Sequence, residues 1–406
     1  MRKRSALAAL CEQMAAYTGT RAHDWYPVFK ARYGMCAVWE AVARVRGKGS
    51  ILTQLFTCST AVDPIPMAGL TPIYSDVDLD TLSISPQLTV NGEPVRQSVH
   101  GVVLQHTFGV FDNRHDEDLA SNAHDLGAIV MEDNAHALGR LARGSDGEPI
   151  ADISVHSFGV QKILTSTRFG GAIWVNPRLA STDPDVDRQI RLSLSSLHKP
   201  AMRTALSARA YLTQIRVFSK LPSRLDQGVR HALQKVRLFE PAVTPAEQKG
   251  RLEYPNLAMT PWVAATALTH LRSLASNLAH RRDIVRIYRE EFADAEGITV
   301  PAAVDTGEPQ PLLLFPILLA DDAHTDAARQ ASRSQHVRAV RWYNTILFPG
   351  SLDDASYSIP PDRGVAQELT HRSLGLPTDV DSAAARAAAR SVRAAIAEDS
   401  SENPVC

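Results

Sequence analysis

The chain has 406 residues, of which 44% are hydrophobic and 21% charged, and its formal net charge at pH 7 is -1. This length and composition predict a globular protein with enough core for two domains. A charge near zero provides no general attraction for nucleic acid or an anionic membrane, so we expect neither as a partner. The four cysteines show no Cys-x-x-Cys spacing. That argues against a disulfide framework or a zinc finger and favours a reducing, cytoplasmic location.

The N-terminus partly imitates a secretory signal, because Met1-Arg2-Lys3-Arg4 precedes a short apolar stretch. Glu12 and Gln13 interrupt that stretch early, and no small-x-small cleavage site follows. We therefore predict an amphipathic helix at this end rather than a signal peptide. Elsewhere no run approaches the roughly 18 apolar residues that a membrane-spanning helix needs.

Apolar runs alternate with helical patterns over residues 34–175. The predicted helices are 34–46, which opens at Gly34, 59–68, and one that begins in the acidic stretch 112–118 and ends near Leu126. The predicted strands are 50–58, 73–75, 99–106, 128–131, 153–158 and 171–175. Several strands are apolar on both faces, which is typical of a parallel or mixed sheet covered by helices on both sides. The fold class is therefore α/β, and such sheets bind ligands at the edge where their strands end.

From about residue 178 to 250 the pattern changes to long helices. Residues 178–240 contain twelve Lys or Arg and five Asp or Glu, a net charge of +7, so the rest of the chain carries -8. This excess is either a solvated helical surface or a rim that attracts a phosphorylated or nucleotide-linked substrate. Further along we predict a helix from Pro261 to about Ala293, strands at 297–301 and 312–319, and a terminal helix at 381–398. We divide the chain into a large domain, 1–250, and a smaller C-terminal α/β domain, 251–406.

Lys162 is the most informative residue of the chain. It follows Ser157 by five residues within an apolar setting, and Asp133 ends an apolar strand upstream. Desolvation would lower the pKa of such a lysine, and a neutral amine beside an acid can form a Schiff base. The acid could keep the ring nitrogen of pyridoxal phosphate (PLP) protonated, and the hydroxyl could hold its phosphate. Taken singly, each residue has an ordinary explanation, as a strand-end lysine that reaches water or an acid that caps a turn.

Five blocks of the chain carry a resemblance to a known family. They are residues 68–82 (AGLTPIYSDVDLDTL), 105–109 (QHTFG), 132–139 (EDNAHALG), 157–162 (SFGVQK) and 256–259 (NLAM). In this order they resemble the AGATPVFVDVDPDTL, HLFG, EDAAQAHG, SFGRGK and NYRM motifs of the DegT/DnrJ family. Its members are PLP-dependent fold-type I aminotransferases that act mostly on nucleotide-linked keto sugars. The resemblance implies a large domain with a mixed, mostly parallel sheet sandwiched by helices, plus a smaller C-terminal domain.

The resemblance also implies a role for each matching residue. Lys162 would form the Schiff base with PLP and later move the proton between substrate and cofactor carbons. Asp133 would pair with the pyridine nitrogen, His136 would lie near the ring hydroxyl, and Ser157 would bind the phosphate. Asn256 would reach the phosphate of the neighbouring subunit's cofactor, which implies a homodimer with shared sites.

The chain departs from the family pattern at three places. The SGTAAL phosphate loop corresponds to residues 33–38, so the amides of Gly34, Met35 and Cys36 would replace the family's Thr hydroxyl. Cys58 stands where the family has an aromatic residue that stacks on the ring. Ala258 replaces the arginine of NYRM and removes one possible substrate contact.

Substrate contacts are predicted at His106, Arg168 and Trp342. A surface position is an equal alternative for Arg168, and packing in a small-domain core, together with Tyr343, is the alternative for Trp342. His106, His115 and His124, with the acids at 112–118, do not have the spacing of a standard metal site, so we predict no metal.

Three functions follow from these residues. The first is transfer of an amino group from glutamate or glutamine to a keto sugar carried on a nucleotide. The second is dehydration or deoxygenation of a sugar on the same cofactor; one deoxygenating relative carries histidine at the lysine position, so Lys162 favours transamination. The third is a regulatory protein that binds PLP or a sugar without turnover, which the altered loop 34–36 and Ala258 suggest.

Overall fold

The computed structural model describes residues 5–95, 99–159, 161–164, 169–236, 238–239, 241, 243–249, 251, 256–349 and 357–402. A seven-stranded sheet forms its centre, in the order β1-β10-β9-β8-β7-β2-β4. Five neighbouring strands are parallel, namely β4 (Thr71–Ser75), β2 (Ser50–Gln54), β7 (Gly101–Gln105), β8 (Ile129–Asn134) and β9 (Ile153–Ser157). β10 (Gly171–Val175) runs against both of its neighbours, β9 and β1 (Trp25–Val28). The predicted mixed, mostly parallel sheet is therefore confirmed.

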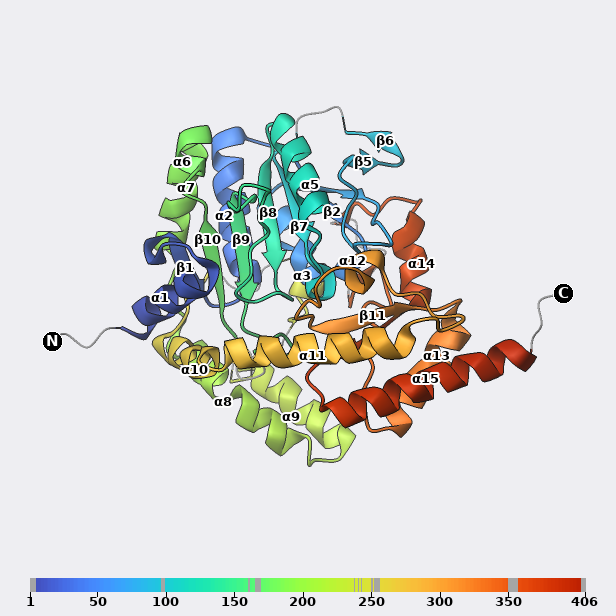
Figure 1. Ribbon diagram of the computed structural model, residues 1–406. Helices are drawn as coiled ribbons and strands as arrows, with labels where there is room; N and C mark the ends of the chain where they lie inside the picture. Colours follow the sequence, from blue (N-terminus) through green and yellow to red (C-terminus); the bar gives the residue numbers. More distant parts are fainter. Residues whose placement is uncertain are drawn as a thin grey trace.

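Helices cover both faces of the sheet (Figure 1). On one face α2 (Ala31–Arg46) packs on β9, β10 and α7 (Pro184–Ser195), which follows α6 (Leu179–Thr182). On the other face α5 (Asn113–Asp125) packs on β7 and β8. Strand residues alternate between the two sides: Val103 joins the α2 core, whereas Val102 and Leu104 join the α5 core. This two-sided burial explains the continuous apolar runs.

A smaller unit lies at the carboxyl edge of the sheet. It pairs β11 (Leu314–Leu318) with β13 (Ser373–Pro377) in antiparallel fashion. Around this pair lie α11 (Leu274–Phe292), α12 (Ala302–Asp305), α13 (Asp322–Ser334), α14 (Gly364–Arg372) and α15 (Ser382–Glu402). β12 (Leu347–Phe348) runs parallel to β3 (Thr57–Cys58) and so joins this unit to the large one. The domain division at residue 250 stays a prediction.

Several predicted boundaries differ from the structure. The predicted strand 297–301 is wrong, because only Thr299 forms a bridge there, to Leu318. The predicted strand 50–58 divides into β2 and β3, the helix 59–68 into α3 (Ser59–Val62) and α4 (Pro64–Met67), and the helix 261–293 into α10 (Pro261–Leu271) and α11. The N-terminal helix is present as α1 (Ala6–Thr18) and packs on α10. Short elements complete the chain: β5 (Thr89–Val90), β6 (Glu93–Pro94) and the 3-10 turns Ala22–Asp24, Thr107–Gly109 and Glu247–Lys249.

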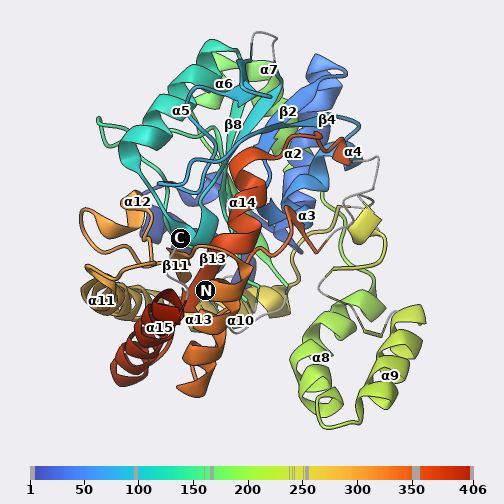
Figure 2. The same ribbon diagram turned by 90° about the vertical axis from the view of Figure 1, so that its right-hand side faces the viewer.

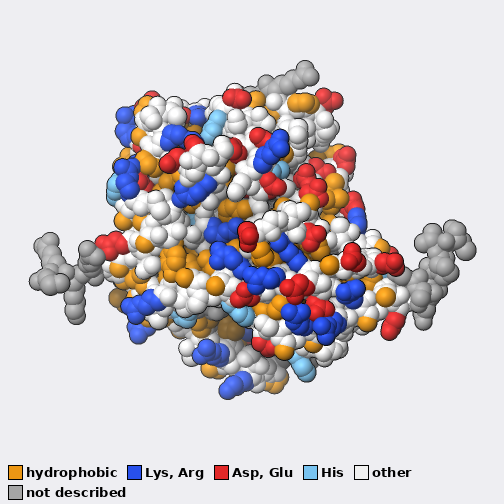
Figure 3. Space-filling view, in the orientation of Figure 1, with side chains coloured by type: hydrophobic (Ala, Val, Ile, Leu, Met, Phe, Trp, Pro, Cys, Tyr) orange, Lys and Arg blue, Asp and Glu red, His pale blue; other side chains and the backbone are white. Residues whose placement is uncertain are grey.

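The basic segment forms a helical hairpin of α8 (Met202–Phe218) and α9 (Ser223–Lys235). Figure 2 shows this hairpin projecting from the rest of the molecule. Met202, Leu206 and Leu225 are exposed on it. On the face shown in Figure 3, acidic and basic side chains are mixed, in keeping with the small net charge. None of the helices in the described part of the chain combines the length and hydrophobicity needed to cross a lipid bilayer.

Candidate functional site

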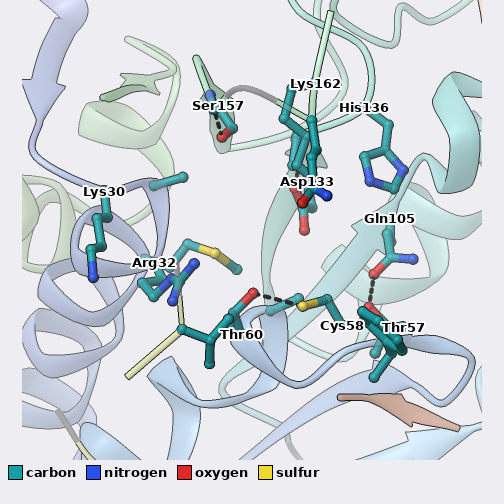
Figure 4. Close-up of a pocket in the computed structure, with 18 of the residues that line it drawn as sticks. Lys30, Arg32, Thr57, Cys58, Thr60, Gln105, Asp133, His136, Ser157 and Lys162 are labelled. Atoms are coloured by element: carbon teal, nitrogen blue, oxygen red, sulfur yellow. Dashed lines mark hydrogen bonds between the residues drawn. The ribbon is translucent and has the colours of Figure 1, made fainter. Parts of the chain in front are cut away.

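A cavity of about 410 Å³ opens where β8 and β9 end, against the start of α2 and the smaller unit (Figure 4). Most of the predicted site residues line it: Met35, Cys58, His106, Asp133, His136, Ser157, Lys162 and Trp342. Asn256 lies elsewhere, and Arg168 falls outside the described residues. Residues far apart in the sequence therefore meet at the edge of the sheet that the strand pattern indicated.

Asp133 and Lys162 face the same cavity. Asp133 occupies the carboxyl end of β8 and is 6% exposed, and one carboxylate oxygen accepts a hydrogen bond from the Ala135 amide at 2.9 Å. Burial raises the pKa of Asp133, while the Ala135 amide and the charge of Lys162 oppose that rise. A buried carboxylate of this kind is stabilised by a cation in the cavity, and a protonated pyridine nitrogen is such a cation.

His136 is held as a neutral ring with a defined tautomer. Its Nδ1 lies 3.0 Å from the amide nitrogen of Phe108, so Nδ1 accepts and the proton is assigned to Nε2. Burial and the nearby charge of Lys162 keep the pKa of His136 well below 6.5. The ring stacks at 5.8 Å on Trp342, which closes this side of the cavity. His136 can therefore offer an N–H donor at physiological pH.

His106 requires a correction, because its ring nitrogens are engaged within the protein. Nδ1 lies 3.0 Å from the carbonyl oxygen of Val110, and Nε2 lies 3.0 Å from a carboxylate oxygen of Glu132. Burial disfavours the charged ring, but Asp116 and Glu132 raise the pKa of His106. His106 lines the cavity, yet its ring braces the ends of β7 and β8 rather than pointing a nitrogen at a substrate.

The start of α2 also corrects the sequence prediction. The helix begins at Ala31, three residues before Gly34, and the cavity is lined there by Lys30, Ala31, Arg32 and Met35. The Gly34 amide bonds to the carbonyl of Lys30, and a Cβ on Gly34 would lie 2.5 Å from Ile173 of β10. Cys36 is fully buried beside Glu40, and burial raises the pKa of its thiol. The glycine thus serves close helix–sheet packing rather than a phosphate loop.

Lys30 and Arg32 form a buried ion-pair cluster with Glu247. Lys30 Nζ lies 3.3 Å from one Glu247 oxygen, and Arg32 lies 2.9 Å from the other. Their side chains are 6% and 17% exposed, and that of Glu247 is fully buried. Lys30 and Arg32 were not predicted from the sequence, because a helix that opens at Gly34 would leave them in a connecting segment.

The remaining polar residues complete the cavity wall. Ser157, at the end of β9, accepts a hydrogen bond from the Gly159 amide at 3.4 Å. Cys58 Sγ lies 2.9 Å from the hydroxyl of Thr60. Thr57 and Gln105, which were not predicted as site residues, are hydrogen-bonded to each other and also line the cavity. Thr57 belongs to β3 and Gln105 ends β7, two strands of different sheets that only the tertiary structure brings together.

The smaller unit contributes two aromatic residues. Lys162 Nζ lies 5.7 Å from the centre of the Trp342 ring. Tyr343 also lines the cavity, and burial, with Cys58 and Asp133 nearby, raises the pKa of its hydroxyl well above 10. The hydroxyl therefore stays protonated and can donate. Trp342 and Tyr343 therefore line the cavity in addition to packing in the smaller unit.

Asn256 does not line the cavity of its own chain. Its side-chain amide donates to Glu40 of α2 at 3.0 Å. A contact with the cofactor of a second subunit remains a prediction.

The residues of the cavity fit PLP. Lys162 would meet the aldehyde and the buried carboxylate of Asp133 the ring nitrogen. The cations, Ser157 and the N-terminus of α2 would hold the phosphate.

Comparisons with known proteins agree with this fit. Residues 12–205 and 240–396 match the DegT/DnrJ/EryC1/StrS aminotransferase family, which leaves out 206–239, most of the α8–α9 hairpin. The "Pleiotropic regulatory protein" of Geobacillus stearothermophilus is 26% identical over 213 residues, 50% of this chain and 55% of that protein. The dTDP-4-dehydro-2,6-dideoxy-D-glucose 3-dehydratase of Saccharopolyspora spinosa is 22% identical over 290 residues, 70% of this chain and 55% of that protein. The chain thus spans about half the length of these curated relatives.

A solved structure supports the fold over nearly the whole chain. The aminotransferase TlmJ from Streptoalloteichus hindustanus superposes with a TM-score of 0.68 at 18% identity, covering 98% of this chain and 92% of that one. With the matching blocks, the sheet order and the cavity, these findings confirm the predicted resemblance: the chain belongs to the DegT/DnrJ/EryC1/StrS aminotransferase family.

Proposed function

We propose that this protein is a PLP-dependent transaminase that moves an amino group from glutamate or glutamine to a keto sugar carried on a nucleotide, a step of amino sugar biosynthesis. The observation that carries the proposal is the convergence of Lys162, Asp133 and His136 on one cavity. When bound, PLP supplies an electron sink for the carbon that loses a proton.

Each residue has a task that follows from its surroundings. Lys162 binds the cofactor through its amine and then carries the proton between the two reacting carbons. Asp133, desolvated and close to Lys162, holds the ring nitrogen in its protonated form. His136 donates its Nε2 proton to an oxygen in the cavity, and Trp342 excludes water on the same side.

The substrate and the assembly belong to the proposal as well. A nucleotide-linked sugar agrees with the excess of basic residues in 178–240. A homodimer would give Asn256 a cofactor to contact, since it does not line its own cavity. A cytoplasmic location agrees with the free thiols of Cys11, Cys36 and Cys58.

Sugar dehydration is the second candidate, because a curated 3-dehydratase is 22% identical over 70% of this chain. Lys162 favours transamination, since its amine can return the proton to the product carbon.

Half-reactions separate the two candidates. The PLP-loaded protein, mixed with glutamate or glutamine, is expected to lose its visible absorption band and to release the corresponding keto acid. Addition of nucleotide-linked keto sugars should then restore the band, with mass spectrometry showing gain of an amine rather than loss of water. Lys162→Ala serves as the inactive control, and a variant that keeps both band and turnover would refute the assignment.

A further inference from the structure

Two cations line the cavity where the sequence predicted backbone amides and a hydroxyl. Lys30 immediately precedes α2 and Arg32 lies in its first turn; both line the same cavity as Ser157 (Figure 4). We propose that Arg32, assisted by Lys30, binds the phosphate ester of the cofactor, so that this chain uses a charged phosphate site in place of a hydroxyl one. The proposal rests on the cofactor of the proposed function and is independent of the sugar.

The geometry places both cations where a phosphate is favoured. The first amides of a helix point away from it and lack acceptors within it, and the helix dipole attracts anions there. Arg32 projects from this turn with a planar guanidinium, which matches phosphate oxygens in a two-pronged contact. Ser157, at the end of β9, contributes its hydroxyl to the same cavity.

Glu247 holds both cations in position beside the cavity. It receives Lys30 on one oxygen and Arg32 on the other, and the Thr244 amide donates to it at 2.8 Å. Burial disfavours the charge of Arg32, but Glu247, with Cys58 and Asp63 nearby, raises the pKa of the guanidinium. Arg32 is thus fixed in position and remains charged.

A purely structural ion pair is the main alternative. In that case Arg32 would only anchor residues 244–249 to α2, and its loss would weaken every ligand of the cavity alike. A contact with the carboxylate of the amino donor is a further alternative, and it would leave cofactor affinity untouched. Pyridoxal, which lacks the phosphate, distinguishes these roles, because it makes the same contacts with Lys162 and Asp133.

The test is equilibrium titration of the cofactor-free protein with PLP and with pyridoxal, followed by absorbance and by tryptophan fluorescence. For Arg32→Gln we expect the Kd for PLP to rise by about tenfold to a hundredfold, because the phosphate loses one charged hydrogen-bonding partner. The Kd for pyridoxal should stay unchanged. Inorganic phosphate should raise the Tm of the cofactor-free wild type and not that of Arg32→Gln. An unchanged Kd for PLP, or an equal loss for PLP and pyridoxal, would overturn the proposal.

Arg46→Gln is the matched control. Arg46 ends the same helix, is 21% exposed, and pairs with Asp183 at 2.7 Å outside the cavity. Both Kd values should stay at the wild-type level in this variant. Should Arg32→Gln fail to fold, Arg32→Lys decides, because it keeps a charge for Glu247 but loses the fork: a PLP-specific loss supports the proposal and no loss refutes it. A wild type that binds PLP tightly yet reacts with no amino donor would refute the transaminase and leave this phosphate site standing.

Discussion

Replacing Glu132 by Gln should destabilise the protein, because Glu132 and His106 form a buried ion pair behind Asp133. Both side chains are 1% exposed, and the paired atoms are 3.0 Å apart. Both nitrogens of His106 face acceptors, so the ring must carry two protons and a positive charge. At an effective dielectric constant of about 20, unit charges at this distance attract by about 5.5 kcal/mol. Desolvation offsets part of that attraction.

Removal of one partner from a buried pair costs about 3–5 kcal/mol. We expect the low end, about 3 kcal/mol, for Glu132→Gln, because Asp116 remains 3.9 Å from His106 and the new amide oxygen can still accept from the Ala142 amide. Urea unfolding of the cofactor-free wild type and variant measures the difference in the free energy of unfolding.

The pH dependence gives the prediction its sign. The folded pKa of His106 is raised, so its stabilisation is complete below about 6.5 and is lost as the pH rises through the folded value. Burial disfavours the charged form of Glu132, but the hydrogen bond and charge of His106 lower its folded pKa. Its stabilisation is therefore complete above about 4.5 and is lost as the pH falls through the folded value. The deficit of Glu132→Gln should therefore be largest between about pH 4.5 and 6.5 and shrink in alkali. A deficit below about 1 kcal/mol, or one that does not change with pH, would contradict a charged pair.

Four further variants test the site and the fold. Asp133→Asn should retain the cofactor yet lower kcat by a hundredfold or more, on the order of the loss of one preorganised electrostatic contact; a near wild-type rate would exclude the ring-nitrogen role. Tyr343→Phe should keep its Tm and its visible band but lose turnover if the protonated hydroxyl donates to the substrate, and full turnover would assign Tyr343 to packing alone. Gly34→Ala should lower the free energy of unfolding in urea by about 1–3 kcal/mol, since its Cβ would meet Ile173. Gly228→Ala on α9, which has open space around it, should raise that free energy by about 0.5–1 kcal/mol. Equal effects would refute the packing role of Gly34.

The wrong predictions concern residues whose environment is set by tertiary structure. Residues 297–301 have strand-like composition, but they lie between a turn that ends at Gly297 and helix α12, which follows Pro301, so they contribute only one bridge to β11. In the sequence His106 looks like a substrate ligand, but in the fold Glu132 and Asp116 both lie next to its ring. Gly34 was predicted to open a helix. The structure instead needs glycine there because a Cβ would collide with Ile173, which lies on a strand more than a hundred residues later.

By itself, the sequence determined the α/β class, the family, and the order of acid, hydroxyl and lysine. A parallel sheet that is buried on both faces requires continuous apolar runs, which are visible in the sequence. The family could be predicted because each matching block is a short, continuous stretch of the chain. Only the tertiary structure decided where α2 begins and which cations reach the cavity. Those outcomes depend on how a helix packs on a sheet and on a buried acid, Glu247, that lies more than two hundred residues from Lys30 and Arg32.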